Sequence, residues 1–311
     1  MRRVATIDVG TNTALLLVAD VGTGPGGLSE CFEEERFVRL GEAVDATREI
    51  QPAALERLRE ALLGYRAVAE AWGAEAVVAA GTSASRDARN RGALVDFVRR
   101  ETGLAYEILS GEEEARWSYA GAVSALPDLD GPCAVVDIGG GSTEIVVGRP
   151  GPGDVPLYRR SLDVGSVRLT ERFFSAQPPG PDEVAAAEAY TRRLVAAAAP
   201  SFDAGTTLLG TAGTVLALAY VAEAAAPGAP FPRELTLDAE TVGWWSASLR
   251  SMTREEVLAL NPGVMAGRAD VFPAGVLVLE VLMREMGFSA CRVSPRGLRH
   301  GLALRWQRAQ R

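Results

Sequence analysis

The chain has 311 residues, a net charge of −8, one histidine and no lysine, so all 32 of its basic residues are arginines. These counts exclude a Schiff-base lysine, a P-loop lysine and a metal site built on several histidines. They also make any Ser-His-Asp or Cys-His mechanism depend on His300.

The bulk composition is typical of a globular chain, with 48% hydrophobic and 23% charged residues. The length is enough for two domains that each bury a core. The acidic net charge disfavours nucleic acid as a partner. Cys31, Cys133 and Cys291 are odd in number and far apart, which indicates a reducing compartment. The sequence shows neither a signal peptide nor an apolar membrane span, so we expect a cytoplasmic protein without a membrane partner.

In the first part of the chain, strands and helices alternate after an opening pair of strands. The strand-forming run 4–8 ends at Asp8 and precedes a turn at 10–13 and a second strand at 14–20. Pro52 opens a helix that continues to about Trp72 with leucines on one face. The other elements expected before a linker at 127–132 are a strand within 28–40, strands at 76–80 and 106–109, and helices at 88–102 and 110–122.

The second part begins by repeating the first. Residues 136–142, Val-Asp-Ile-Gly-Gly-Gly-Ser, echo residues 7–13, Ile-Asp-Val-Gly-Thr-Asn-Thr, at an offset of 129, and a strand follows each turn. This repeat indicates an internal duplication of a whole domain. The remaining expected strands are at 133–137, 144–147 and 290–293, and a strand-turn-helix is expected at 208–214. Helices are expected at 182–199 with Asp182 as N-cap, at 253–260 with a Thr253/Glu256 capping box, at 275–286 and at 298–308. Loops are expected at 148–156 and 226–232.

Three turns rich in Gly and Thr follow predicted strands, at residues 8–13, 137–143 and 210–214. Their backbone N–H groups and hydroxyls can hold a phosphate without a lysine, and their glycines allow a close approach to an oxyanion. Asp8 and Asp137 end their strands, where carboxylates can hold Mg²⁺. An ordinary turn is the commoner explanation for any one of them, but three in this order favour phosphate binding. The candidate phosphate-binding residues are Gly10, Thr11, Asn12, Thr13, Gly139, Gly140, Gly141, Ser142, Thr143, Gly210, Thr211, Gly213 and Thr214.

Three consecutive glutamates follow Ser110, and helix geometry separates them. With Ser110 as N-cap, Glu113 is the third helical residue and closes a capping box. Glu112 precedes Arg116 by four residues, which is a favourable surface pair. Glu114 has no such local partner in the sequence and is the glutamate expected to face a cleft. The alternative is a solvated acidic helix start that the helix dipole stabilises.

Six ordered motifs extend from Ile7 to about Gly301: residues 7–13, 81–90 (Gly-Thr-Ser-Ala-Ser-Arg-Asp-Ala-Arg-Asn), 110–115 (Ser-Gly-Glu-Glu-Glu-Ala), 136–144 (ending Ser-Thr-Glu), 165–173 and 268–271. The order of the three Gly/Thr-rich turns, at 8–13, 137–143 and 210–214, resembles the two phosphate motifs and the adenosine motif of the superfamily that includes actin and the sugar kinases. More narrowly, the chain resembles the exopolyphosphatase/guanosine pentaphosphate phosphohydrolase (Ppx/GppA) family in its short, two-domain form. The resemblance implies an α/β fold of two duplicated ribonuclease H-like (actin-like ATPase) domains, residues 1–124 plus 298–311 and residues 125–297, with an interdomain cleft.

The resemblance also implies the chemistry. It assigns catalysis to Glu114 and Glu144, and it makes Asp137 and Glu144, with Asp8, ligands of Mg²⁺, for which Mn²⁺ is a substitute. Arg86 is implied as a phosphate contact. Arg39 and Arg268 are weaker candidates that structural ion pairs would equally explain.

The implied reaction is Mg²⁺-dependent hydrolysis of a terminal phosphoanhydride of inorganic polyphosphate, with release of orthophosphate. Guanosine pentaphosphate is the alternative substrate, and the residues do not decide between the two. More remote alternatives are a small-molecule kinase of the superfamily and a non-catalytic alarmone or polyphosphate sensor, and the acidic residues argue against both. A homodimer is also among the expectations.

The last motif departs from the family pattern. The family commonly has Ser-Asp-x-Gly-Leu-Arg-Glu-Gly, whereas residues 294–301 here carry Pro295 and His300 in place of the two acids. We expect His300 at the surface and the cysteines in the core. The chain stops soon afterwards, without the helical domains of long family members, so the resemblance implies low processivity on long polyphosphate.

Overall fold

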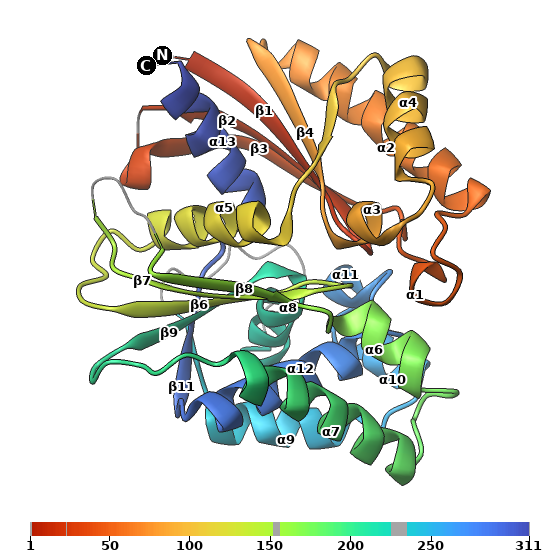
Figure 1. The fold of residues 1–311 in the computed structure, drawn as a ribbon, viewed down its shortest axis with the longest axis vertical. Helices are drawn as coiled ribbons and strands as arrows, with labels where there is room; N and C mark the ends of the chain where they lie inside the picture. The colour runs from red at the N-terminus through yellow and green to blue at the C-terminus, as the bar shows by residue number, and fades with distance from the viewer. Residues whose placement is uncertain (1, 23, 152–155, 225–234, 311) are drawn as a thin grey trace. The chain divides into compact units, whose positions relative to one another are not determined.

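The computed structural model describes residues 2–22, 24–151, 156–224 and 235–310 (Figure 1). The chain divides into two compact units, which we call unit 1 (residues 1–129 and 296–311) and unit 2 (residues 130–295). The chain therefore leaves unit 1 once and returns to it for the last helix. The boundaries expected from the sequence, 124/125 and 297/298, lie a few residues from these divisions.

Unit 1 is built on a five-stranded mixed sheet in the order β3-β2-β1-β4-β5. The first three strands form an antiparallel meander, and β4 and β5 extend the sheet parallel to β1. The strands are β1 (Arg2–Val9), β2 (Thr13–Val21), β3 (Leu28–Phe37), β4 (Ala76–Gly81) and β5 (Tyr106–Ile108). The helices are η1 (Pro25–Gly27), α1 (Val44–Thr47), α2 (Pro52–Ala71), α3 (Ser83–Asp87), α4 (Arg91–Thr102), α5 (Gly111–Ser124) and α13 (Leu298–Ala309).

Side chains along β1 alternate between two cores. Ile7 and Val9 belong to a buried cluster with residues of α2 and α4, whereas Val4 belongs to a cluster with residues of α5 and α13. Successive side chains of a strand point to opposite faces of the sheet. Asp8 therefore lies on the same face as Thr6, whose hydroxyl donates to a backbone carbonyl of α13 at 2.8 Å. This alternation places Asp8 on the side of the sheet that α5 and α13 cover.

The helices α5 and α13 approach each other backbone to backbone. A Cβ atom added at Gly121 would overlap the carbonyl of Gly297, and one added at Gly301 would overlap the carbonyl of Trp117. Such a close approach requires glycine at the crossing. The last helix of the chain therefore fixes the position of α5, the helix that begins with the three glutamates.

Unit 2 is built on a six-stranded sheet in the order β10-β11-β9-β6-β7-β8. From β8 to β11 the pairings are antiparallel, antiparallel, parallel and parallel, the same succession as from β3 to β5 in unit 1. The strands are β6 (Cys133–Ile138), β7 (Thr143–Gly148), β8 (Tyr158–Leu162), β9 (Thr207–Thr211), β10 (Thr236–Asp238) and β11 (Ala290–Val293). The helices are α6 (Ser166–Phe173), α7 (Pro181–Ala198), α8 (Ala212–Ala222), α9 (Ala239–Leu249), α10 (Arg254–Leu260), α11 (Pro262–Met265) and α12 (Phe272–Met286).

The duplication predicted from the sequence is present in the backbone. The N–H of Gly10 donates to the Thr13 carbonyl at 2.8 Å, and that of Gly139 donates to the Ser142 carbonyl at 3.0 Å. Each turn closes an antiparallel pair, β1 with β2 and β6 with β7. The expected fold class, two duplicated α/β domains, is confirmed. The interdomain cleft stays a prediction.

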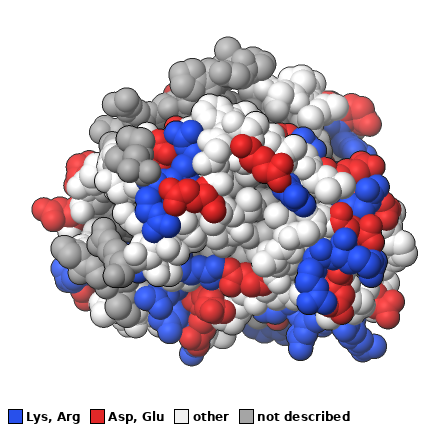
Figure 2. Space-filling view, turned by 90° about the horizontal axis from the view of Figure 1, so that it is seen from above, with Lys and Arg blue, Asp and Glu red and all other residues white. Residues whose placement is uncertain are grey.

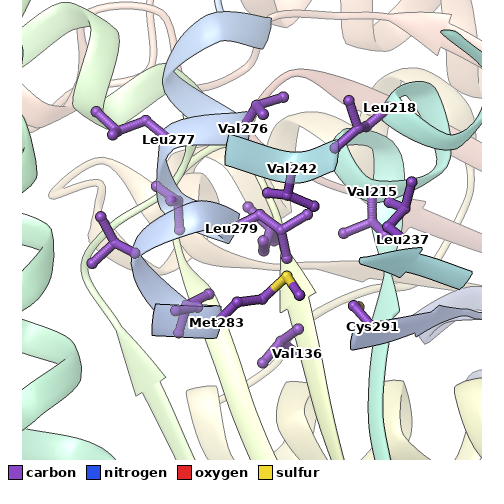
Figure 3. Close-up of a cluster of buried hydrophobic side chains, with 14 of the residues drawn as sticks. Val136, Val215, Leu218, Leu237, Val242, Val276, Leu277, Leu279, Met283 and Cys291 are labelled. Carbon is purple, nitrogen blue, oxygen red and sulfur yellow. The ribbon is translucent and has the colours of Figure 1, made fainter. Parts of the chain in front are cut away.

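The core of unit 2 fills one face of its sheet. Figure 3 shows Val136 of β6 below side chains of the covering helices, among them Val215 of α8, Val242 of α9 and Met283 of α12. Because Val136 points into this core, the next residue along the strand, Asp137, points to the other face. The hydrophobic pattern of β6 thus decides which way the acid points.

Several helix ends differ from those expected. The helix expected at 88–102 begins later, as α4 at Arg91, and a separate short helix, α3, precedes it. Helix α12 starts at Phe272, before the expected 275. Asp182 is not an N-cap, because α7 begins one residue earlier at Pro181, and Glu183 accepts the N–H of Gly180 at 2.8 Å. The capping box at Thr253 is confirmed. The loop at 226–232 and residues 152–155 of the loop at 148–156 lie outside the described residues.

Surface charges of both signs lie among uncharged residues (Figure 2). On the face shown in Figure 2, arginines and acidic residues lie next to one another and do not form a field of one sign. Some pairs lie within a helix, such as Arg66 with Glu70 at 2.8 Å in α2. Exposed pairs of this kind contribute little to stability. None of the described helices is long and apolar enough to cross a membrane.

Candidate functional site

The first turn of α5 separates the three glutamates as the sequence predicts. Ser110 Oγ accepts the Glu113 N–H at 3.2 Å, and the Glu113 carboxylate accepts the Ser110 N–H at 3.0 Å, which confirms the capping box. Glu112 and Glu113 are exposed, whereas the Glu114 side chain is only 9% exposed. A buried carboxylate requires a charged or hydrogen-bonding neighbour to offset the loss of water. Glu114 is therefore the unusual member of the three.

That neighbour is Arg86, in the last turn of α3. Its Nη1 donates to Glu114 Oε2 at 2.7 Å and to the Leu109 carbonyl at 3.1 Å. Both side chains are largely shielded from water, with 23% of Arg86 exposed, so the charge-assisted bond is stronger than it would be at the surface. Arg86 is thus held where it fixes the carboxylate of Glu114. Its contact with a phosphate stays a prediction.

The turn at 10–13 is supported from behind by the segment that follows β3. The N–H groups of Arg39 and Gly41 donate to the carbonyls of Asn12 and Thr11 at 2.9 and 2.8 Å. A Cβ atom at Gly41 would overlap the Thr11 side chain, so this position requires glycine. Arg39 itself adopts a left-handed backbone conformation, with a φ of 45°, next to the turn. The structure therefore brings Arg39 to the first turn through its backbone.

The acids of unit 2 form a pair across two strands. Asp137 of β6 and Glu144 of β7 are direct partners in the antiparallel ladder, and both are buried. Directly opposed residues share one face of a sheet with their Cβ atoms about 5 Å apart. Glu144 Oε1 also accepts the hydroxyl of Ser161 of β8 at 2.7 Å. Neighbouring carboxylates on one face of a sheet repel each other, and a cation or a proton between them offsets that repulsion.

The turn between these strands presents mainly backbone. The Thr143 hydroxyl donates to the Val164 carbonyl at 2.6 Å and is used within the fold, and Ser142 is buried. The expected contribution of this turn to phosphate binding therefore depends on its N–H groups. Phosphate binding by any of its residues stays a prediction.

The third turn joins β9 to α8 and contains backbone strain. Ala212 has a φ of 69°, a left-handed conformation that costs free energy in any residue but glycine. Arg268 Nη1 donates to the Gly213 carbonyl at 3.0 Å, and the Ser294 N–H donates to the Gly210 carbonyl at 2.8 Å. Arg268 thus lies against the predicted phosphate turn and holds its backbone.

The predicted residues therefore fall into two sets. Unit 1 contains Glu114 with Arg86, and Asp8 on the sheet face that α5 covers. Unit 2 contains the pair Asp137 and Glu144, with Arg268 on the third turn. The described residues include no cluster of three or more His, Cys, Asp or Glu side chains placed to hold a metal.

Comparison with known proteins places the chain in a family. The model of the Ppx/GppA phosphatase family matches residues 17–310. The chain belongs to this family. It is 38% identical to Exopolyphosphatase 2 of Mycobacterium tuberculosis over 98% of each chain. Among solved structures, an exopolyphosphatase-like protein matches with a TM-score of 0.90 at 31% identity, over 100% of this chain and 99% of the other. The Aquifex aeolicus member of the Ppx/GppA family matches with a TM-score of 0.81 at 29% identity, over 99% and 98%.

The expected surface position of His300, in the last motif, was wrong. His300 is 1% exposed; its Nδ1 accepts the Gly297 N–H at 3.3 Å, and its Nε2 lies 3.3 Å from Glu33 Oε1. Burial lowers the pKa of His300 to about 4. Burial alone would raise the pKa of Glu33, but the bond from His300 and the charge of Arg299 outweigh it and lower the pKa to about 2. His300 is therefore a neutral part of the unit 1 core.

The cysteines follow the expected pattern in part. Cys133 and Cys291 are buried thiols, and burial raises the pKa of Cys291 to about 12. Cys31 is partly exposed.

One residue at the site of this Ppx/GppA family member was missed. Arg168 of α6 is 6% exposed, and its Nε donates to the Gly141 carbonyl at 2.6 Å. The motif at 165–173 was matched as a whole, without a role for its arginine. The available signal was an arginine three residues after Gly165, and it does not indicate a contact with a backbone carbonyl.

Proposed function

We propose that the chain is an exopolyphosphatase that hydrolyses the terminal phosphoanhydride of inorganic polyphosphate, with Mg²⁺, and releases orthophosphate. The observation that carries this proposal is the buried carboxylate of Glu114, which Arg86 holds at 2.7 Å in the first turn of α5. A full-length relative named an exopolyphosphatase, with 38% identity, supports the choice of substrate.

The residues divide the reaction between them. Hydrolysis of a phosphoanhydride needs an oriented water, a base for its proton and stabilisation of the negative charge on the phosphoryl oxygens. Glu114 orients the water and takes its proton, and Arg86 keeps the carboxylate in one rotamer. Glu144 assists in positioning the water. The N–H groups of the turns at 10–13 and 139–142 bind phosphate oxygens.

The donor set of unit 2 fits Mg²⁺. Asp137 and Glu144 supply carboxylate oxygens from opposed positions on two strands, and their mutual repulsion favours a cation between them. Mg²⁺ commonly binds one or two carboxylates and completes its shell with water and substrate phosphates, so a cluster of three acids is not required. When bound, Mg²⁺ neutralises charge on the phosphoryl oxygens. Asp8 is the further ligand we propose, and Mn²⁺ is the substitute.

A comparison of substrates tests the proposal. Orthophosphate release is measured from short polyphosphate, long polyphosphate and guanosine pentaphosphate, each with Mg²⁺, with Mn²⁺ and with EDTA. We expect the protein to release orthophosphate from polyphosphate only when the metal is present. Glu114→Gln should abolish this release. Release from guanosine pentaphosphate alone would replace the proposed substrate with the alternative one. Release from neither would contradict the proposed activity.

A further inference from the structure

The start of α6 packs against one side of the turn at residues 139–142, between β6 and β7. The backbone N–H groups of residues 166–168 donate to the carbonyls of the first two glycines of the turn at 2.8–3.0 Å. The side chain of Arg168 donates through Nε to the third carbonyl, that of Gly141, at 2.6 Å. Three successive carbonyls of the turn therefore point toward α6.

The geometry of the peptide bond then fixes the N–H groups. In a planar trans peptide the carbonyl and the following N–H point in opposite directions. The N–H groups of Gly140, Gly141 and Ser142 therefore point away from α6. Within the described part of the chain these three N–H groups donate to no acceptor. Successive N–H groups on one side of a turn form an anion-binding nest.

The contact between α6 and the turn leaves little room for the turn to move. A Cβ atom at Gly165 would lie 2.6 Å from the carbonyl carbon and oxygen of Gly140, which is closer than real contacts allow. Arg168 is itself 6% exposed, so its guanidinium is packed and not free to swing. Three donors to the turn are backbone groups that no substitution removes cleanly. Arg168 supplies the fourth through a side chain that a substitution can remove.

We propose that Arg168 is a positioning residue that orients the Gly141–Ser142 peptide, so that the Ser142 N–H is directed at the bound phosphate. The inference rests on the proposed function, since it gives a role to the turn that binds phosphate there. It assigns Arg168 to the back of the turn, away from the substrate.

The third turn has the same arrangement. Arg268 Nη1 donates to the Gly213 carbonyl at 3.0 Å, so the following N–H, that of Thr214, points away from the guanidinium. Two arginines in unit 2 therefore hold glycine carbonyls of two predicted phosphate turns from behind. With no lysine in the chain, arginine is the cationic side chain available for this task.

The test is a titration of ¹⁵N-labelled protein with inorganic orthophosphate, followed at the amide signals of residues 140–142. We compare the unchanged protein with Arg168→Met and Arg168→Lys, and with Arg172→Met as matched control. Arg172 lies one turn further along α6, exposed, and donates to the Tyr190 hydroxyl at 2.6 Å. Thermal unfolding of each variant shows whether the fold is retained.

In the unchanged protein we expect orthophosphate to shift the three amide signals. Arg168→Met should weaken this binding about tenfold, because one hydrogen bond that orients the turn is lost. Arg168→Lys, which keeps a donor, should recover most of the affinity, and Arg172→Met should leave it unchanged. If Arg168→Met does not fold, Arg168→Gln carries the same expectation, since glutamine is too short to replace the guanidinium.

Unchanged affinity in a folded Arg168→Met or Arg168→Gln, or the absence of any shift at residues 140–142, would overturn the inference. Polyphosphate hydrolysis of the unchanged protein separates this inference from the proposed function. Orthophosphate binding at 140–142 without hydrolysis would contradict the function and keep the role of Arg168. Hydrolysis that is unaffected in the folded Arg168 variants would keep the function and remove that role.

Discussion

The turn after β1 in unit 1 and the turn after β6 in unit 2 are closed by the same hydrogen bond, at positions 129 residues apart in the chain. The side chains around the two turns differ. In unit 2, the strand partner of Asp137 is Glu144, whereas the strand partner of Asp8 in unit 1 is Leu15. The second acid of unit 1 is Glu114, which comes from a helix. The duplicated scaffold therefore supports a cross-strand acid pair in unit 2, whereas in unit 1 an arginine holds the carboxylate of Glu114.

The support behind the two turns differs as well. The segment after the third strand packs against the turn in both units, and in each a glycine allows the contact, Gly41 in unit 1 and Gly165 in unit 2. In unit 1 the backbone N–H groups of Arg39 and Gly41 donate to the turn, whereas in unit 2 the guanidinium of Arg168 donates in addition to backbone N–H groups. The turn in unit 2 is therefore held by a side chain as well as by backbone groups.

The largest expected effect concerns the acid pair. Glu144→Gln keeps the size of the side chain and an acceptor for Ser161 but removes the charge. We expect turnover of polyphosphate to fall by about 100-fold or more, and the Mg²⁺ concentration for half-maximal rate to rise. Steady-state rates across a Mg²⁺ series measure both.

The matched variant in unit 1 is Asp8→Asn, which alters the acid whose strand partner is Leu15. We expect a smaller loss for it than for Asp137→Asn, its counterpart in unit 2. A loss as large as that of Asp137→Asn, together with unaltered Mg²⁺ dependence in Glu144→Gln, would remove the distinction between the units.

The second effect concerns the base and its arginine. Arg86→Met removes the guanidinium next to Glu114, so we expect turnover to fall about tenfold to 100-fold, with Arg86→Lys in between. Arg89→Met, at an exposed position two residues past α3, is the control and should retain full turnover. Equal turnover in Arg86→Met and Arg89→Met would show that Arg86 does not position the base.

The third effect is on the pH dependence of stability. It belongs to unit 1, which contains His300, the one histidine of the sequence. The pKa of His300 is lowered from 6.5 to about 4, so protonation of the unfolded chain destabilises the fold as the pH falls below 6.5. Between pH 7 and pH 5 the free energy of unfolding should decrease by about 2 kcal/mol from this group. Urea denaturation at both pH values measures it. His300→Gln, which does not titrate, should lose correspondingly less, and an equal loss in both proteins would contradict the assignment.

The smallest effect compares two capping boxes. Ser110→Ala in unit 1 and Thr253→Ala in unit 2 should each lower the free energy of unfolding by about 1 kcal/mol. Only Ser110→Ala should also lower turnover, by a few-fold, because Glu114 lies in the turn that Ser110 caps. A parallel loss of turnover in Thr253→Ala would indicate a general effect of destabilisation.

The sequence predicts the features that depend on neighbouring residues. The duplicated turns, the strands around them and the capping boxes at Ser110 and Thr253 are local patterns, and the structure contains them. The helix α9 was missed although its N-cap is also local, since Asp238 accepts the N–H of Thr241 at 2.7 Å. By contrast, the N-cap of α6 is Gly165, which has no side chain to accept a hydrogen bond, so the start of this helix is not visible in the sequence.

The contacts that define the site are not local. Arg86 and Glu114 are 28 residues apart and meet because α3 and α5 follow neighbouring parallel strands. His300 is buried where β3 brings Glu33 next to α13, a contact between residues far apart in the chain. Arg168 acts on a backbone carbonyl, which no residue pattern identifies. Such roles depend on packing, and the sequence alone cannot predict them.

The central claim, that Glu114 is the base and not a substrate-binding group, is tested most directly with Glu114→Gln. The dissociation constant of short polyphosphate and the turnover rate are measured on the same preparation, with Glu113→Gln as control. We predict a dissociation constant within about twofold of the unchanged protein and a turnover lower by at least about 100-fold. Turnover near that of the unchanged protein, or a loss of binding as large as the loss of turnover, would contradict the account.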